Sequence, residues 1–211
     1  MFVVMGDEGY GSARVVGLDA LKALAHPLRV RIFSALSSYG PATASALALR
    51  LGESSGATSY HLRQLERHGF VREDTQRGNG RDRWWERTPG TIEVGAESSG
   101  GSEAGRAAED LIQSEFQQIE NERFVDYLRG RDQVSDDWRA AAQITFANVS
   151  LTAEELRRFG TEFDALVDRY RGRDENDPGR RRVDVHLRAF PVLDPTPAEI
   201  RPARPEEGTE S

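Results

Sequence analysis

The chain has 211 residues, of which 37% are hydrophobic and 30% are charged, and it contains no cysteine. This length suits one large domain or two small ones, and the missing cysteines exclude disulfides, thiolate metal sites and cysteine nucleophiles. The net charge of −7 is uneven, because residues 1–90 hold 12 Lys and Arg against 9 Asp and Glu while residues 91–211 hold 16 against 26; only the first part therefore favours an anionic partner.

The N-terminal stretch MFVVMGDEGYG begins with a few apolar residues. It lacks the basic region and the small-residue cleavage site of a signal peptide. No window of the chain approaches the 18 or more apolar residues of a membrane-spanning helix. We therefore expect a cytoplasmic protein that does not cross a membrane.

Two short helices are predicted between residues 18 and 39. Leucines at near-helical spacing indicate the first of them. Pro27 suits the first turn of the second, where a backbone N–H is not needed. Gly40 and Pro41 then end that helix.

Residues 43–68 predict two further helices joined by a tight turn. Thr43 is suited to cap the start of the first, which Gly52 ends. Ser54 is suited to cap the second, and Gly69 stands where that helix would stop. Two neighbouring helices of this kind form a helix-turn-helix arrangement.

The second of these helices has two chemically different faces. Thr58, Leu62 and Leu65 share one face and would hold the helix on its domain. The other face is small, hydroxyl-rich and cationic, whereas a merely solvated face is usually rich in Glu and Lys. Its residues are Ser55, Gly56, Ser59, Tyr60, Arg63 and Arg67.

A β-hairpin is predicted directly after this helix, in the stretch FVREDTQRGNGRDRWWERTPG that begins at Phe70. Phe70 and Val71 begin one strand, the tryptophans belong to the other, and the stretch RGNGRD supplies glycines for the turn. One of the two adjacent tryptophans should face the core, since side chains alternate along a strand. A hairpin in this position is a wing, and three arginines crowd its tip, namely Arg77, Arg81 and Arg83.

The stretches LKALAHPLRVRIFSAL, SYHLRQLERHGFV and GNGRDRWWE together resemble the winged-helix domain of the ArsR family of bacterial repressors. The resemblance covers roughly residues 15–90. It implies a homodimer that binds a palindromic operator on double-stranded DNA and is released by an effector.

The exposed face of the second helix would then read DNA. The major groove accepts a helix, and Arg can contact guanine through two hydrogen bonds. Gly56 and Ser59 would allow close approach, while Arg67 and the wing arginines suit phosphates or a narrow minor groove. His61 lies at the border of the two faces and is either a phosphate contact or a packed or capping residue. The alternative for the arginines is plain solvated surface, which would leave a winged domain used only for protein interaction or dimerisation.

The founding members of that family sense metals through cysteine-rich sites, and this chain has no cysteine. His61 and His68 stand seven positions apart, roughly 10 Å along a helix, so these two residues alone cannot share a metal ion. We expect no metal and no cofactor. His26 and His186 are interpreted as structural or surface histidines.

Residues 91–102 include the stretch GAESSGGS and are predicted to be a flexible linker by composition. A long helix follows from residue 103 to residue 129. Its apolar stripe would be exposed to water on a small winged domain, so a second copy of the chain is the expected partner. The predicted dimer interface consists of Leu18, Leu21, Leu111, Ile112 and Ile119.

The last part of the chain predicts a strand, a helix and a strand. Residues 142–150 favour the first strand, Thr152 and Glu155 form a capping box for the helix, and RVDVHLRAF alternates like a second strand. A small-molecule effector could bind an apolar pocket in this module, although plain core is the alternative for the three aromatic residues. The residues considered are Phe159, Phe163, Tyr170 and His186.

The expected fold is therefore α+β and mainly α, in four segments: a winged helix-turn-helix DNA-binding domain (15–90), a linker (91–102), a dimerisation and effector module (103–191) and a disordered tail (192–211). No nucleophile elbow, phosphate loop or paired-carboxylate site is visible in the sequence. The expected function is a dimeric transcriptional regulator, most simply a repressor, and not an enzyme.

Overall fold

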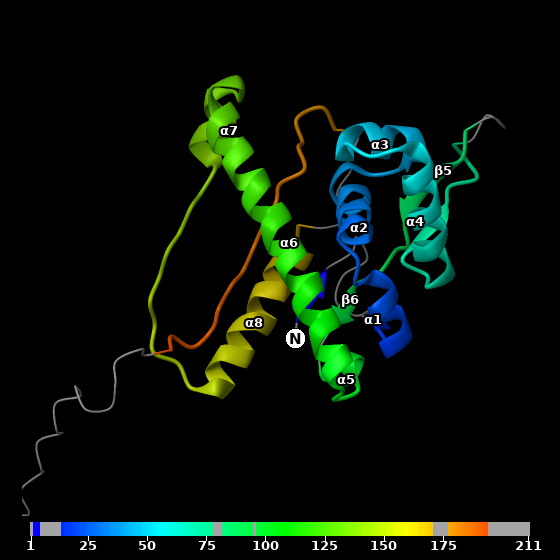
Figure 1. The fold of residues 1–211 in the computed structure, drawn as a ribbon. Coiled ribbons are helices and arrows are strands. Elements are labelled where there is room, and N and C mark those ends of the chain that lie inside the picture. Colours follow the sequence, from blue (N-terminus) through cyan, green and yellow to red (C-terminus); the bar gives the residue numbers. More distant parts are fainter. Residues whose placement is uncertain (1, 5–13, 78–81, 95, 171–176, 194–211) are drawn as a thin grey trace, which may run out of the picture.

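We describe a computed structural model of the chain, which places residues 2–4, 14–77, 82–94, 96–170 and 177–193. The described part is mainly helical, with two small three-stranded sheets (Figure 1). No described helix is long and apolar enough to cross a membrane. In chain order the first elements are β1 (Phe2–Val4), β2 (Arg14–Val15), α1 (Leu18–Leu24), α2 (Pro27–Tyr39), β3 (Ala42–Thr43), α3 (Ala44–Leu51) and α4 (Ser55–Arg67).

The second half of the order begins with the wing and ends in helices. Its elements are β4 (Val71–Glu73), β5 (Trp84–Arg87), β6 (Ile92–Val94), α5 (Ala96–Ser99), α6 (Glu103–Gly130), the 3₁₀ helix η2 (Arg131–Gln133), α7 (Asp136–Ala141) and α8 (Ala153–Asp168).

The helix boundaries predicted from capping residues are confirmed. The side chains of Thr43 and Ser54 accept hydrogen bonds from Ala46 N–H and Ala57 N–H, at 3.1 Å each, at the starts of α3 and α4. Gly52 ends α3 in the left-handed conformation, with φ of 69°. The two helices therefore form the predicted helix-turn-helix.

The predicted wing is also present. β4 and β5 pair antiparallel, with Val71 opposite Arg87, and β3 pairs with the other edge of β5. Trp85 is buried and Trp84 is only partly buried, as the alternation along a strand requires. A second sheet was not predicted: β6 lies between β1 and β2, far from both in sequence.

The predicted linker at residues 91–102 is wrong. This stretch contains β6 and α5, and Ile92, Val94, Ser98 and Ser99 are buried. Its small residues serve close packing rather than flexibility, because they allow α5 to approach α6 at Gly105. The boundary predicted after residue 90 is wrong as well, since one continuous apolar core includes side chains from Val16 to Ile119.

Gly105 should be intolerant of even one methyl group. A Cβ placed there would lie 2.2 Å from the backbone oxygen of Ser99 and 2.6 Å from its Cα. A Gly-to-Ala change inside a helix normally gains up to about 1 kcal/mol, but here α5 must move. We expect Gly105→Ala to lower the free energy of unfolding by about 1–3 kcal/mol, measured by chemical denaturation. Gly56→Ala is the matched control, because nothing lies within 4 Å of its added methyl group. Equal stability of the two variants would contradict the observed packing of α5.

The predicted dimer interface is largely wrong, because the chain buries these residues in its own core. Leu21 and Ile112 have no exposed surface and Ile119 is 9% exposed, while Leu18 and Leu111 are partly buried. The first half of α6 packs against α1 and α2, and Phe116 meets Phe33 edge to face at 6.4 Å. The apolar stripe on α6 is thus part of the core of the winged domain and is not available to a second copy of the chain.

The C-terminal part agrees with the prediction only in its helix. Thr152 and Glu155 form the capping box at the start of α8: Thr152 N–H donates to the Glu155 carboxylate at 2.7 Å. The two flanking strands are absent, since residues 142–152 and 179–193 are extended without sheet pairing in the described structure. The predicted disordered tail falls mainly on residues 194–211, outside the described residues.

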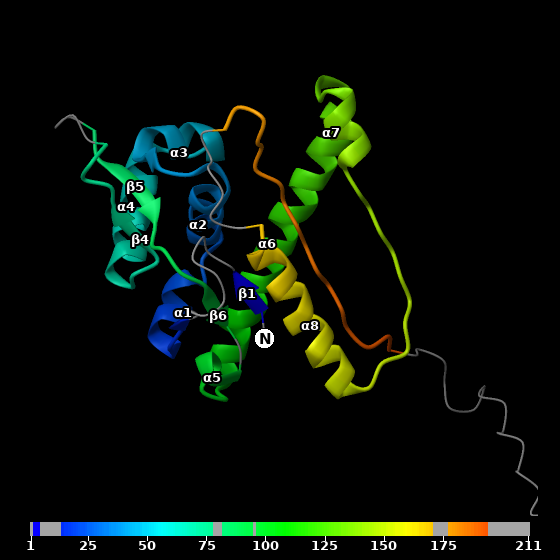
Figure 2. The same cartoon turned by 180° about the vertical axis from the view of Figure 1, so that it is seen from behind.

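Among the described residues, α8 forms neither the expected effector pocket nor the alternative of a core. α8 has no buried residue, and Phe159 and Tyr170 are 43% and 64% exposed. In both views α8 lies beside α6, on the side away from α1–α4 (Figures 1 and 2). His186 lies instead against α6.

We call residues 181–193 the strap, because this extended segment runs along α6. Glu120 on α6 accepts a hydrogen bond from Arg188 at 2.6 Å and lies 3.4 Å from Nδ1 of His186. Arg123, also on α6, lies 3.7 Å from the Asp184 carboxylate and donates to the Ser34 hydroxyl at 2.9 Å. Alternate polar side chains of the strap therefore attach it to the helix.

This attachment should depend on pH. The hydrogen bond to Glu120 raises the pKa of His186 above its usual value, although burial opposes the shift. A raised histidine pKa stabilises the attached state fully below about pH 6.5, and that contribution is lost as the pH rises through the shifted pKa. Burial alone would raise the pKa of Glu120, but the hydrogen bonds from His186 and Arg188 outweigh it and lower the pKa; this second contribution is lost only in acid.

We expect an NMR titration to place the His186 imidazole above the usual histidine pKa, and Glu120→Gln to bring it back down. An unchanged His186 titration in Glu120→Gln would contradict the observed contact.

Candidate nucleic-acid interface

The two faces of α4 are arranged as the sequence predicts. Thr58, Leu62 and Leu65 have no exposed surface, and the Thr58 hydroxyl donates to the Ser54 carbonyl at 3.0 Å. On the opposite face Ser59 is partly buried and the other candidate residues are exposed, namely Ser55, Gly56, Tyr60, Arg63 and Arg67. The core side of α4 thus fixes an outer strip of small, hydroxyl and cationic groups.

Arg63 and Arg67 differ from the wing arginines in their surroundings. Within the described residues, neither of them has an ion-pair partner. Arg77 instead pairs with Asp74 at 3.0 Å, and Arg83 pairs with Glu73 at 3.1 Å. The two helix arginines can therefore bind an anionic ligand without first breaking an ion pair, whereas Arg77 and Arg83 cannot.

The third wing arginine, Arg81, lies outside the described residues. The wing also carries acidic side chains on its strands, and Arg72 pairs with Glu86 at 2.7 Å across the hairpin. The described part of the wing is thus close to electrically balanced, which its arginines alone did not suggest.

This surface stands apart from the rest of the molecule. α4 and the β4–β5 hairpin lie at one edge of the fold, and α8 lies toward the other, with α6 between them (Figures 1 and 2). Leu49 on α3 is 87% exposed. A large ligand could reach α4 and the wing together without touching the C-terminal part.

His61 is packed, as one of the two sequence interpretations held. Its ring lies 4.4 Å from that of His26, whose Nδ1 accepts a hydrogen bond from Leu28 N–H at 3.2 Å and so caps α2. Burial lowers the pKa of both histidines, and the nearby charge of Arg29 lowers each further. At neutral pH the pair is therefore uncharged. Arg29 was missed in the sequence analysis, although it follows directly on the AHPL stretch.

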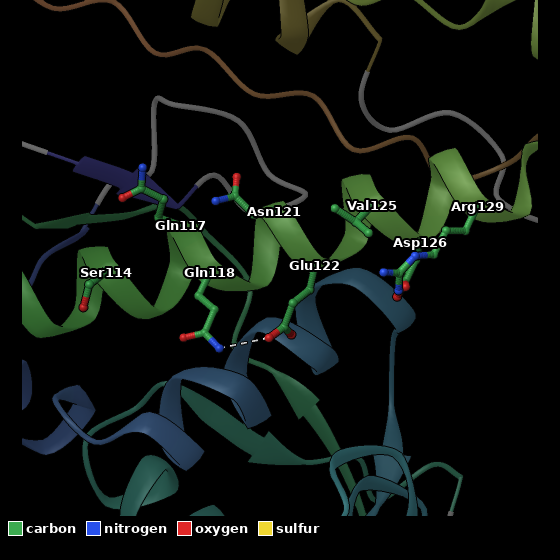
Figure 3. Close-up of a pocket in the computed structure, with 8 residues that line it drawn as sticks. All are labelled: Ser114, Gln117, Gln118, Asn121, Glu122, Val125, Asp126 and Arg129. Carbon is green, nitrogen blue, oxygen red and sulfur yellow. Dashed lines mark hydrogen bonds between the residues drawn. The ribbon is translucent and has the colours of Figure 1, made fainter.

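Two hollows occur on the described surface, and neither gathers a catalytic or metal-binding set. One of about 350 Å³ lies beside His26 and His61 and is also lined by Arg31 and Glu53. The other follows a polar face of α6, where Gln118 donates to Glu122 at 3.0 Å; all of its lining side chains come from that single helix (Figure 3). No group of three His, Asp or Glu side chains that could hold a metal ion occurs among the described residues.

Comparison with known proteins supports the helix-turn-helix assignment. Residues 24–74 match a family model described as a helix-turn-helix domain. This range contains α2, α3, α4 and the start of the wing, but it is only a quarter of the chain. No curated protein matches the chain significantly.

Three solved structures show partial similarity. A possible transcriptional regulator for arsenical resistance is 28% identical, over 52% of this chain and 95% of its own, with a TM-score of 0.30. An apo mutant of ZitR from Lactococcus lactis is 14% identical, over 70% and 84%, with a TM-score of 0.31. The transcriptional regulator Tm0710 from Thermotoga maritima is 12% identical, over 73% and 87%, with a TM-score of 0.27. At such TM-scores none of them superposes on the whole chain, so we base the assignment on the chain's own elements and on the family match.

Proposed function

We propose that this chain is a sequence-specific DNA-binding transcriptional regulator of the ArsR type, which acts as a homodimeric repressor and carries no catalytic activity. The observation that carries the proposal is the outer strip of α4. This strip combines close-approach residues, hydroxyls and two arginines without protein partners on a helix whose opposite face is fully buried.

The chemistry of the strip suits the major groove of DNA. Gly56 and Ser55 allow the start of α4 to approach the bases, and Arg63 can donate two hydrogen bonds to guanine. Arg67 and the wing residues Arg77, Arg81 and Arg83 suit backbone phosphates, which position a protein without reading sequence. The local partners Asp74 and Glu73 weaken the attraction of the wing, because each exposed ion pair must open before its arginine meets a phosphate.

Homodimerisation follows from the size of the strip. One recognition helix covers too few base pairs for useful specificity, whereas two copies related by a two-fold axis read an inverted repeat with half-sites about 34 Å apart. Release by a small-molecule effector is proposed from the resemblance to the ArsR family. The absence of cysteine argues against thiolate metal sensing as the release mechanism.

Selection of bound DNA from a random pool by the full chain tests this function. We expect enrichment of an inverted repeat, and binding of that sequence at least a thousandfold tighter than of a scrambled one. Equal binding of selected and scrambled DNA would contradict sequence-specific readout. It would favour a winged domain used for protein interaction.

A further inference from the structure

The strap contacts α6 through its polar side chains and leaves its apolar side chains exposed. Its polar residues Asp184, His186 and Arg188 point to α6, where Arg123 and Glu120 hold them. Its apolar residues alternate with these, and Val183, Val185 and Leu187 are 64%, 58% and 38% exposed. An alternating strand normally buries its apolar side. We therefore expect another protein surface to cover this side of the strap.

The extended segment before α8 has the same property. Residues 143–152 read QITFANVSLT and contain no charged residue, although 30% of the chain is charged. Ile144, Phe146 and Val149 in this segment are 54%, 92% and 70% exposed. An uncharged, β-favouring segment left open in this way would drive aggregation unless a partner covered it.

The two extended segments do not pair with each other through backbone hydrogen bonds within one chain. Within the described residues, neither of them has a strand partner, and the one backbone hydrogen bond to another element is the bond from Leu156 N–H to the Thr152 carbonyl at the start of α8. In both views α8 and the segment before it lie on the side of α6 away from α1–α4, whereas the strap begins beside α3 and runs down past α6 (Figures 1 and 2). The two extended segments and α8 are therefore present, but the segments are not paired into the sheet that the sequence predicts.

We propose that a second copy of this chain supplies the pairing: residues 143–152 of one copy form β-strand hydrogen bonds with residues 183–193 of the other, and the two α8 helices cover the resulting sheet. Exchange of identical elements between copies is a low-cost route to a dimer. Each copy contributes both kinds of strand, so a two-fold arrangement leaves neither kind without a partner.

The exposed area supports a second copy as the occupant. The apolar side chains left open on α8 and the two segments expose on the order of 1,000 Å² per copy. This area agrees with the roughly 800 Å² that each partner buries in a standard stable interface.

The inference deepens the dimer of the proposed function and rests on it only for the use of the dimer on DNA. It replaces the stripe on α6, which is buried within the chain, by the C-terminal region as the contact between copies. The strip on α4 lies at the opposite edge of the fold and stays free for DNA in this arrangement.

Sedimentation of the full chain in the absence of DNA gives the first test. We expect a dimer, and we expect the double variant Phe146→Asp with Val185→Asp to raise its dissociation constant at least a hundredfold. Both positions are exposed in the single chain, so far-UV circular dichroism of the variant should keep the helix content of the parent. Leu49→Asp is the matched control, because it places the same charge at an 87% exposed leucine on α3. A monomeric parent, or a double variant that dimerises as well as Leu49→Asp, would overturn the proposal.

Cross-linking tests the pairing itself, and the natural chain offers no competing cysteine. Chains that carry Asn148→Cys and chains that carry Ala189→Cys, with tags of different length, are mixed and treated with a short bismaleimide. We expect a cross-linked species that contains both tags. A chain carrying both substitutions should also join to a second chain. If it closes only on itself and stays monomeric, the segments pair within one chain and the proposal is wrong.

These results can be separated from the outcome for DNA. A dimer that depends on Phe146 and Val185 but binds no selected DNA would leave the inference standing and remove the proposed function. If the chain binds the selected DNA and both substitutions leave its dimer unchanged, the proposed function stands and the inference about the dimer contact is wrong.

Discussion

Replacing Ile112 by Asp should unfold the winged domain instead of producing a folded monomer. Ile112 has no exposed surface and lies in the core that joins α6 to α1 and α2. Truncating a buried isoleucine costs about 2–5 kcal/mol, and an unpaired carboxylate at the same place adds several more. A domain of this kind has a total stability of about 5–15 kcal/mol. We therefore expect loss of the cooperative thermal transition, measured by circular dichroism.

The neighbouring residue provides the control. Leu111 is only partly buried, so Leu111→Asp should keep the cooperative transition and lower the free energy of unfolding by about 1–2 kcal/mol. The sequence interpretation placed both residues in a dimer interface, which predicts two folded monomers. A folded, monomeric Ile112→Asp variant would restore that interpretation and refute the core position described here.

The elements predictable from the sequence are those that local chemistry determines. Ser54 and Thr43 cap helices through hydrogen bonds to N–H groups three residues away, so their effect is readable in a short window. The burial of Thr58, Leu62 and Leu65 follows from helical period alone. For the same reason the outer strip of α4 is identifiable from the sequence alone.

The errors occur where a residue's partner is distant in sequence. The apolar stripe on α6 is visible in the sequence, but whether α2 of the same chain or a second copy covers it is a tertiary fact. β6 was overlooked because its partners β1 and β2 are far away in sequence: Val3 pairs with Glu93, and Arg14 pairs with Ile92. In the stretch from 95 to 103, glycine and serine indicate flexibility by composition, whereas the contact of Ser99 with Gly105 gives them a packing role.

The strap shows a different limit. Its alternation of apolar and polar residues predicts a strand, but in the described structure the segment is extended and has no strand partner. Period two tells which side chains share a face but not which face meets the domain. Here the charged groups Glu120 and Arg123 on α6 select the polar face, which a hydrophobicity argument would have assigned to solvent.

Arg63→Ala should cause the largest loss of DNA affinity of any single change in the outer strip of α4. Arg63 is exposed, and in the described structure no carboxylate holds it. A two-pronged contact from arginine to guanine is worth about 1–3 kcal/mol of discrimination. We expect roughly a 10- to 100-fold loss on the selected inverted repeat, and a much smaller loss on scrambled DNA, in fluorescence anisotropy at fixed salt.

Arg77→Ala is the matched comparison, because it removes the same charge from the wing. Arg77 is paired with Asp74, and a phosphate contact that replaces an existing surface ion pair gains little, since such pairs are worth about 0–1 kcal/mol. We therefore expect a smaller loss that is equal on both DNAs, and a shallower salt dependence of binding by about one unit. If Arg63→Ala weakens both DNAs equally and Arg77→Ala relaxes the sequence preference, base reading belongs to the wing and not to α4.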